Sequence, residues 1–189
     1  MKVLGINSSP NLNGSTAKII DMFLNRCIEK GAETERIDLQ DYMIENCENC
    51  LNCTNNEECI YNDDFLQLKA KMLNYDGIII ASPYFSGKAS ENLEALVERL
   101  VTSSQNRKYF TNKYFVGLSV SLNDSADEVA KYCASLGGLI NNNNGTILGT
   151  LSVSRISDCG IGEVDEDEKI KDKIDQIANK LIKNLLINN

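Results

Sequence analysis

The 189-residue chain lacks histidine and tryptophan entirely, and it contains only two prolines. Without an imidazole it cannot hold a Ser-His-Asp or Cys-His catalytic system, a histidine-ligated zinc ion or a haem bound by histidine. Its chemistry must therefore use thiolates, carboxylates, hydroxyls, backbone groups or a bound cofactor.

Basic residues are also few, since 19 Lys and Arg stand against 27 Asp and Glu and leave a net charge of −8. No basic run occurs, which argues against nucleic-acid binding because that depends on clustered cations. The N-terminus has too short an apolar stretch for a signal peptide, and no run reaches the length of a membrane span. We therefore expect a cytoplasmic protein with no nucleic-acid or membrane partner. In a reducing cytoplasm, its seven cysteines are more often metal or redox ligands than disulfides.

Short apolar runs rich in β-branched residues alternate with longer amphipathic stretches along the whole chain. This alternation predicts a doubly wound parallel α/β sheet. No repeat, linker or composition shift divides the sequence, so residues 1–189 are expected to form a single domain. The expected strands cover residues 2–7, 33–39, 77–81, 114–122 and 146–153, and the expected helices cover 15–30, 63 or 64 to 73, 90–100, 124–136 and 165–187.

The loop after the first expected strand, residues 7–16, carries hydroxyl and amide side chains directly into a helix N-terminus. Backbone N–H groups, hydroxyls and the helix dipole at such a place can bind a phosphate. The loop has neither the Walker pattern nor Gly-x-Gly-x-x-Gly, so it suits a terminal phosphate monoester. An ordinary turn with a helix cap is the alternative, because Ser and Asn are also common capping residues.

The loop after the third expected strand carries Pro83, and the chain's other proline is Pro10. In a sheet of order 2-1-3-4-5 these prolines would follow the two strands that flank the switch point, where ligands bind. Gly87 permits a close approach of the backbone to a ring, and Tyr84 and Phe85 offer aromatic surface to a flat heteroaromatic ligand. Packing of both aromatic side chains into the core is the alternative.

Four cysteines within thirteen residues form the most specific motif of the sequence. They are spaced Cys-x2-Cys-x2-Cys-x5-Cys, at Cys47, Cys50, Cys53 and Cys59. Three thiols at three-residue intervals let one loop, residues 47–59, wrap a compact cluster that the fourth thiol closes, and this favours [4Fe–4S]. Structural zinc, which more often uses two separated Cys-x2-Cys knuckles, and metal-free redox thiols are the alternatives.

The other three cysteines carry weaker signals. Cys27 and Cys133 fall on apolar helix faces, and free cysteines in such positions are commonly buried, so we expect both in the core. Cys159 lies in an expected loop and has no assigned role.

In combination, these motifs resemble those of the iron-sulfur flavoprotein family, a branch of the flavodoxin-like NAD(P)H-dependent FMN reductases. The resemblance covers most of the chain and depends on three motifs in order: Ser9-Pro10, the cysteine motif followed by Asp63-Asp64, and residues 76–85 leading to 93–99. It implies a flavodoxin-like five-stranded sheet with a cysteine-rich loop after the second strand. It also implies a homodimer or homotetramer in which a cluster lies near a flavin across a subunit interface.

The resemblance assigns FMN to the first two loops and a [4Fe–4S] cluster to the four cysteines. Two places depart from the family pattern. Asn11 stands where many relatives have Arg, so dipoles and hydroxyls must meet the phosphate charge, and residues 119–124 contain no glycine where relatives usually do. The residues implied to hold FMN are Ser9, Asn11, Ser15 and Thr16 at its phosphate, and Pro83, Tyr84, Phe85, Ser86 and Gly87 along its ring.

The resulting hypothesis is an FMN-dependent oxidoreductase in which electrons pass between FMN and a [4Fe–4S] cluster. FMN exchanges one or two electrons and the cluster exchanges one, so the pair suits an adaptor linked to ferredoxin or to NAD(P)H. One alternative is an NAD(P)H-dependent flavin, quinone or nitro-compound reductase without a cluster. Another is a non-catalytic thiol or metal sensor on a receiver-like fold, although the acidic pocket of a receiver is missing after the first strand.

Overall fold

The fold is described here from a computed structural model of the chain. It describes residues 1–55, 59–84, 86–103, 109–122, 126–135, 145–154, 156, 164 and 167–187. The sequence predictions for Phe85, for Cys159 and for residues 123–124 lie outside the described residues.

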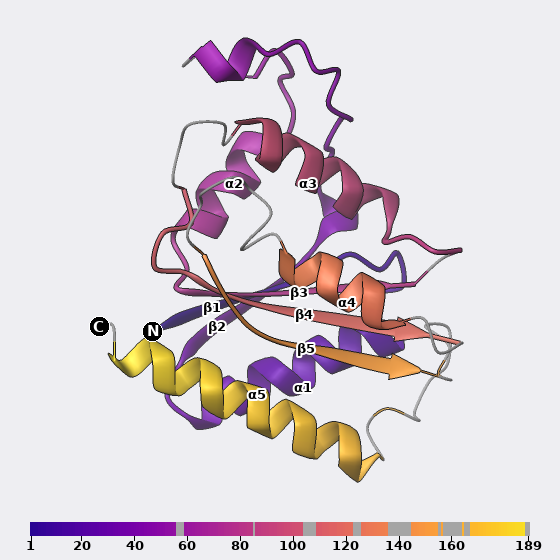
Figure 1. Ribbon diagram of the computed structural model, residues 1–189, viewed down its shortest axis with the longest axis vertical. Coiled ribbons are helices and arrows are strands. Elements are labelled where there is room, and N and C mark those ends of the chain that lie inside the picture. The colour runs from indigo at the N-terminus through magenta and orange to yellow at the C-terminus, as the bar shows by residue number, and fades with distance from the viewer. Residues whose placement is uncertain are drawn as a thin grey trace.

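A parallel five-stranded sheet of order β2-β1-β3-β4-β5 forms the centre of the molecule (Figure 1). Every neighbouring pair of strands is parallel, so all the carboxyl ends lie at one edge. This confirms the predicted flavodoxin-like sheet, whose switch point lies between β1 and β3. The strands are β1 (Lys2–Asn7), β2 (Glu33–Asp38), β3 (Gly77–Pro83), β4 (Tyr114–Ser121) and β5 (Thr146–Ser154).

Helices cover both faces of the sheet. Helices α1 and α5 lie on one face, and α2, α3 and α4 lie on the other (Figure 1). The cysteine-rich segment follows β2 and projects beyond α3, away from the sheet. The helices are α1 (Ser15–Glu29), α2 (Phe65–Leu73), α3 (Glu91–Ser103), α4 (Ala126–Ser135) and α5 (Glu168–Ile187).

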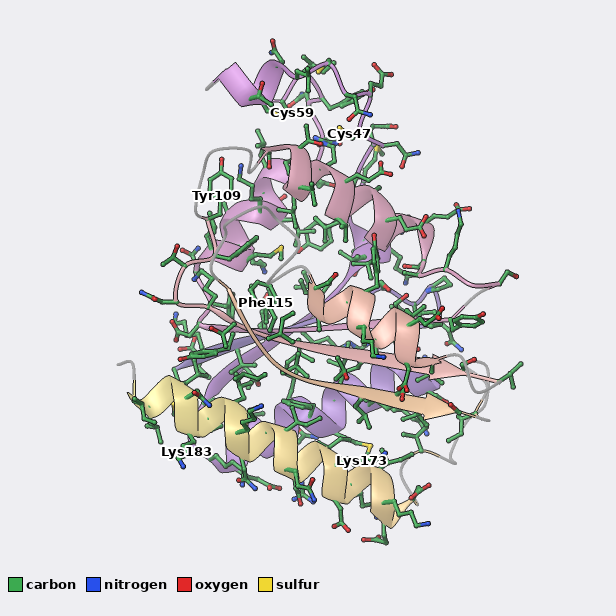
Figure 2. All side chains as sticks on the ribbon, viewed as in Figure 1. Cys47, Cys59, Tyr109, Phe115, Lys173 and Lys183 are labelled. Atoms are coloured by element: carbon green, nitrogen blue, oxygen red, sulfur yellow. The ribbon has the colours of Figure 1, made fainter. Side chains whose placement is uncertain are left out.

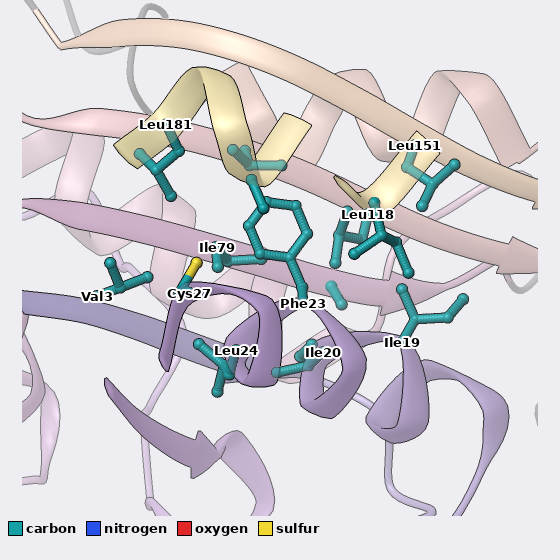
Figure 3. Packing of buried hydrophobic residues seen from close by; sticks show 14 of the residues in the cluster. Val3, Ile19, Ile20, Phe23, Leu24, Cys27, Ile79, Leu118, Leu151 and Leu181 are labelled. Atoms are coloured by element: carbon teal, nitrogen blue, oxygen red, sulfur yellow. The ribbon is translucent and has the colours of Figure 1, made fainter. Parts of the chain in front are cut away.

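The core has two parts, one on each side of the sheet. Phe23 of α1 packs between the sheet and α5, beside Cys27 (Figure 3). Phe65 of α2 and Cys133 of α4 belong to the opposite part. Both cysteines are fully buried, which confirms that they are core residues, and burial raises the pKa of the Cys27 thiol to about 12.

The unbroken apolar run of β3 is buried along its whole length, as expected for a strand covered on both faces. The strand also runs two residues further than predicted. Pro83 pairs with Val120, and the N–H of Tyr84 donates to the carbonyl of Val120 at 2.8 Å. Proline is tolerated because it is the last residue of the strand, and this extension fixes where the next loop begins.

Close backbone packing sets α4 against the sheet at Gly117 of β4. A Cβ atom at this position would lie 1.9 Å from the carbonyl oxygen of Ala130 and 2.5 Å from the amide nitrogen of Ala134. Only glycine permits this approach.

Within the described residues, no helix is long and apolar enough to span a membrane.

Candidate functional sites

The loop after β1 is anchored to the strands on both sides. The buried side chain of Asn7 donates to Asp38 Oδ1 of β2 at 2.7 Å and accepts the N–H of Ser9 at 3.1 Å. The N–H of Ser8 donates to the carbonyl of Ala81 in β3 at 2.9 Å. The loop is therefore held in one shape at the switch point of the sheet.

Arg36 of β2 fastens the same loop from its outer side. Its Nη2 donates to the carbonyl of Leu12 at 2.9 Å, while Nη1 pairs with Asp21 at 2.7 Å and Nη2 with Asp38 at 2.9 Å. Burial alone would lower the pKa of Arg36, but the hydrogen bonds and charges of the two carboxylates raise it. The sequence gives no signal for this role, because Arg36 is one of several charged residues in an edge strand.

The start of α1 suits an anion. Gly14 is its N-cap, its N–H closes a turn onto the carbonyl of Asn11 at 3.1 Å, and the first turn has no acidic residue. Ser15 and Thr16 are buried in that turn. The N–H of Asn11 in turn donates to Ser9 Oγ at 2.9 Å. The four residues predicted at the phosphate thus lie on one continuous loop and helix N-terminus, where backbone donors and the helix dipole favour negative charge.

The loop after β3 is closed on itself by a serine. Ser82 Oγ accepts the N–H of Ser90 at 3.0 Å and donates to the carbonyl of Pro83 at 3.0 Å. Ser86 and Gly87 both have positive φ, of 48° and 92°, which makes a sharp turn that glycine favours.

Of the two aromatic residues in this loop, only Tyr84 is described. It is half-buried and packs against the core on the α2 and α3 face, so the core alternative holds for part of its side chain. The ring contact predicted for Tyr84 stays a prediction.

A cavity of about 470 Å³ lies between the two loops. Two of its lining side chains, Ser8 and Ser90, are buried, and their hydroxyls have no hydrogen-bond partner in the structure. Buried polar groups are normally paired, so two unpaired hydroxyls among the lining residues of one cavity indicate a polar ligand. The cavity is lined by Ser8, Pro10, Lys88, Ala89, Ser90, Glu91, Asn92 and Glu94.

Of the nine residues predicted to hold FMN, the eight that the structure describes are not in that lining, although Ser8 and Pro10 are direct neighbours of Ser9. Lys88 and Ser90 were missed by the sequence reasoning. Lys88 could have been found, since it is the only cation in the two loops, residues 7–16 and 82–90. It also offers the positive charge that Asn11 does not supply.

All four cysteines of the predicted motif line one pocket, which encloses about 20 Å³. Figure 2 shows Cys47 and Cys59 in the segment beyond α3, and Cys47 Sγ donates to Thr102 Oγ1 of that helix at 3.5 Å. Burial and the charges of the other three thiolates raise the pKa of the Cys53 thiol. The structure thus brings the thiols together, and within the described residues no three His, Cys, Asp or Glu side chains are arranged to hold a single metal ion.

The backbone of the cysteine loop is tightly wound around Cys50. Asn49 and Leu51, on either side of it, have φ of 52° and 61°. A left-handed conformation is uncommon for Asn and rare for a residue such as Leu, and such outliers concentrate at sites that bind ligands.

A buried ion pair closes the base of the cysteine segment. Arg99 of α3 binds Asp63 through both carboxylate oxygens, at 2.7 Å and 3.1 Å, and donates to the carbonyl of Glu45 at 2.9 Å. The Arg99 and Asp63 side chains are only 2% and 4% exposed. Asp63 also accepts the N–H of Glu45 at 2.9 Å. Arg99 therefore joins the residues just before and just after the cysteine motif.

The electrostatics of this pair favour both charges. Burial alone would raise the pKa of Asp63, but hydrogen bonds from Arg99 and from backbone N–H groups hold it below its usual value. The sequence predicted that α2 begins at Asp63 or Asp64: Asp64 is the N-cap without a side-chain cap hydrogen bond, and Asp63 Oδ1 accepts the N–H of Phe65 at 3.2 Å.

Comparison with known proteins agrees with this arrangement. The sequence profile described as NADPH-dependent FMN reductase matches residues 1–143. Over 125 residues the chain is 34% identical to an iron-sulfur flavoprotein of Methanosarcina thermophila, covering 66% of this chain and 64% of that protein. Over 99 residues it is 38% identical to an iron-sulfur flavoprotein of Methanocaldococcus jannaschii, covering 52% and 51% of the two chains.

A crystal structure of RosB with bound 8-demethyl-8-formylriboflavin-5′-phosphate is similar at a TM-score of 0.74 and 18% identity, over 99% of this chain and 79% of that chain. At this identity the likeness shows the fold alone. The matched regions span less than two thirds of the two curated relatives, at 64% and 51% of their lengths. The family profile covers most of the chain, including β1 to β4 and their loops, and the chain therefore belongs to the NADPH-dependent FMN reductase family.

Proposed function

We propose that this protein is an FMN-dependent oxidoreductase in which electrons pass between FMN and a [4Fe–4S] cluster held by Cys47, Cys50, Cys53 and Cys59. The observation that carries the proposal is the convergence of four cysteine thiols on one pocket, in a chain of a flavin-reducing family. The names of the curated relatives, iron-sulfur flavoproteins, support both cofactors.

The residues at the switch point fit FMN. The unpaired hydroxyls of Ser8 and Ser90 can donate to the flavin or its phosphate, and Lys88 supplies a positive charge. The N-terminus of α1 provides a dipole free of acidic side chains in its first turn. When bound, FMN supplies the one- and two-electron chemistry, while these residues bind and orient it.

The thiol pocket fits a cluster with one iron for each cysteine. Burial and, after it, the charges of the other three thiolates raise the pKa of the Cys53 thiol, and a positively charged iron core would offset both effects. The tight winding of the backbone at Asn49 and Leu51 lets one short loop present three of the thiols to one side. Zinc remains an outcome of the test below.

We further propose that the active form is a homodimer or homotetramer. The FMN cavity is lined by the first turn of α3, up to Glu94, and the thiol pocket by its last turns, from Arg99 on. The lining residues of the two sites are therefore about 8 to 18 Å apart along the helix of one chain. Three large apolar side chains in and next to the cysteine loop lie on the surface: Met43, Leu51 and Ile60 are 69%, 50% and 53% exposed. We propose that a second copy buries these side chains and brings its own FMN cavity to the thiols. Ferredoxin or NAD(P)H is the proposed electron donor.

Purification without air tests the cluster directly. We expect one FMN, about four iron atoms and about four acid-labile sulfides per chain. Cys50→Ala should release the iron and keep FMN, whereas Cys27→Ala, a core cysteine on the other face of the sheet, should keep both. An iron-free wild-type protein that retains FMN and oxidises NADPH rapidly would identify a cluster-free reductase, and stoichiometric zinc without sulfide would identify a structural zinc site.

A further inference from the structure

The least explained polar atom near the thiol pocket is Nε of Arg99. The side chain is 98% buried and lines the pocket. Its Nη1 donates to Asp63 and to the backbone carbonyl of Glu45, and its Nη2 donates to Asp63. Its Nε–H has no hydrogen-bond partner in the structure. An unpaired buried donor is rare and costly, so a partner in the pocket is expected.

Two aromatic rings lie close to the guanidinium of Arg99. The Arg99 Cζ atom lies 4.4 Å from the ring centroid of Phe65 and 5.2 Å from that of Tyr61. With the fork bound to Asp63, the group cannot turn to satisfy Nε elsewhere. Its orientation is therefore set before anything binds in the pocket.

Cys59 lines the same pocket and is the thiol whose charge acts on the guanidinium of Arg99. Burial would lower the pKa of Arg99, but Asp63 and the Cys59 thiolate together raise it. Among the described residues, the other charged groups at the pocket are acidic: Glu48 lines it, and Asp63 pairs with Arg99. Arg99 is accordingly the only cationic side chain among the pocket's lining residues.

We propose that Arg99 donates its Nε–H to the sulfur ligands, at Cys59, and that the Arg99–Asp63 pair sets the reduction potential of the group these thiolates hold. This role rests on the proposed cluster. One-electron reduction adds one negative charge to that group and neither makes nor breaks a bond. A buried cation and a hydrogen bond to sulfur stabilise the added charge, whereas the buried carboxylate opposes it.

The two members of the pair should then act in opposite directions. Arg99→Gln removes the cation and should lower the reduction potential, disfavouring reduction about tenfold, which is about 59 mV for one electron. Asp63→Asn leaves Arg99 uncompensated and should raise the potential by a similar amount. Arg99→Lys keeps the charge but loses the planar fork and Nε–H, so its potential should fall between those of the wild type and Arg99→Gln.

The test is a mediated redox titration of the anaerobic holoprotein, followed by electron paramagnetic resonance, with iron and sulfide measured in each sample. Arg26→Gln is the matched control, because Arg26 pairs with Glu29 and Asp175 on the other face of the sheet and should leave the potential unchanged. Opposite shifts in Arg99→Gln and Asp63→Asn support the proposal. Shifts in the same direction, or none, overturn it.

Loss of the cluster is also decisive. If Arg99→Gln loses iron, the sign of the shift in Asp63→Asn decides alone. If both variants lose iron, the pair is an anchor of the segment and the tuning role is wrong. A wild-type protein without iron and sulfide would instead refute the proposed function itself, so the two failures are distinguishable.

Discussion

Ser8→Ala should stabilise the protein without FMN and weaken its binding of FMN. The residue is 3% exposed, its hydroxyl is unpaired, and it is one of the residues that line the cavity between the two loops. An unpaired buried hydroxyl costs about 1–3 kcal/mol, so removing it should raise the free energy of unfolding by about 1 kcal/mol. In a chain of this size, that corresponds to a melting temperature about 2–4 °C higher.

The effect on FMN has the opposite sign because the ligand supplies the missing partner. A hydrogen bond to a charged group contributes about 1.5–3 kcal/mol, so its loss should weaken FMN binding by about 10- to 150-fold. The assay combines thermal unfolding of the flavin-free protein with a fluorescence titration of FMN, whose emission changes on binding. Ser90→Ala should behave in the same way.

Ser119→Ala is the matched control. Ser119 is fully buried with an unpaired hydroxyl but does not line the cavity, so its replacement should stabilise the fold and leave FMN affinity unchanged. Unchanged FMN affinity in Ser8→Ala, or an equal loss in Ser119→Ala, would refute the assignment of the cavity to FMN.

Three further predictions concern a loop anchor, a packing contact of the sheet and the buried ion pair. Arg36→Met removes the hydrogen bond to the carbonyl of Leu12 and should weaken FMN binding about tenfold, as measured by flavin titration, while iron content stays the same. Gly117→Ala places a Cβ atom 1.9 Å from the carbonyl oxygen of Ala130, so overpacking should lower stability by about 1–3 kcal/mol in denaturant unfolding. The lowered pKa of Asp63 stabilises the fold fully above the ordinary Asp value of about 3.9, and this contribution should disappear as the pH falls through the lowered value. Asp63→Asn should remove that part of the acid dependence from the unfolding curve of the cluster-free protein.

Each of these predictions has a contradicting result. Equal FMN affinity in Arg36→Met would show that the loop keeps its shape without the arginine. Full stability of Gly117→Ala would mean that α4 does not pack against the backbone of β4. An unfolding curve of Asp63→Asn that matches the wild type between pH 5 and 2 would show that the ion pair does not contribute.

Sequence reasoning succeeded where the signal is local. The apolar run of β3 and the alternation of strands and helices predicted a doubly wound parallel sheet, because each element's pattern lies within its own residues. The strand order, in contrast, was implied by the family resemblance. The close spacing from Cys47 to Cys59 likewise brought the four thiols to one pocket. The loop between β1 and α1 was also recognisable, since it is a single segment of chain.

The missed residues act across long stretches of sequence. Arg36 contacts Leu12 across 24 residues, and Arg99 contacts Asp63 across 36. Neither arginine differs from an ordinary surface residue in its local pattern, and only packing reveals that one is nearly fully buried. The sequence also cannot show that the hydroxyls of Ser8 and Ser90 are buried and unpaired beside one cavity, because this depends on how the two loops pack together.

The most direct test of the central claim is a count of electrons. The anaerobic holoprotein is titrated with dithionite while its flavin and iron-sulfur absorption are followed. We expect an uptake of about three electrons per chain, two by FMN and one by the cluster. Full reduction by about two electrons, with only flavin bands changing, would contradict it.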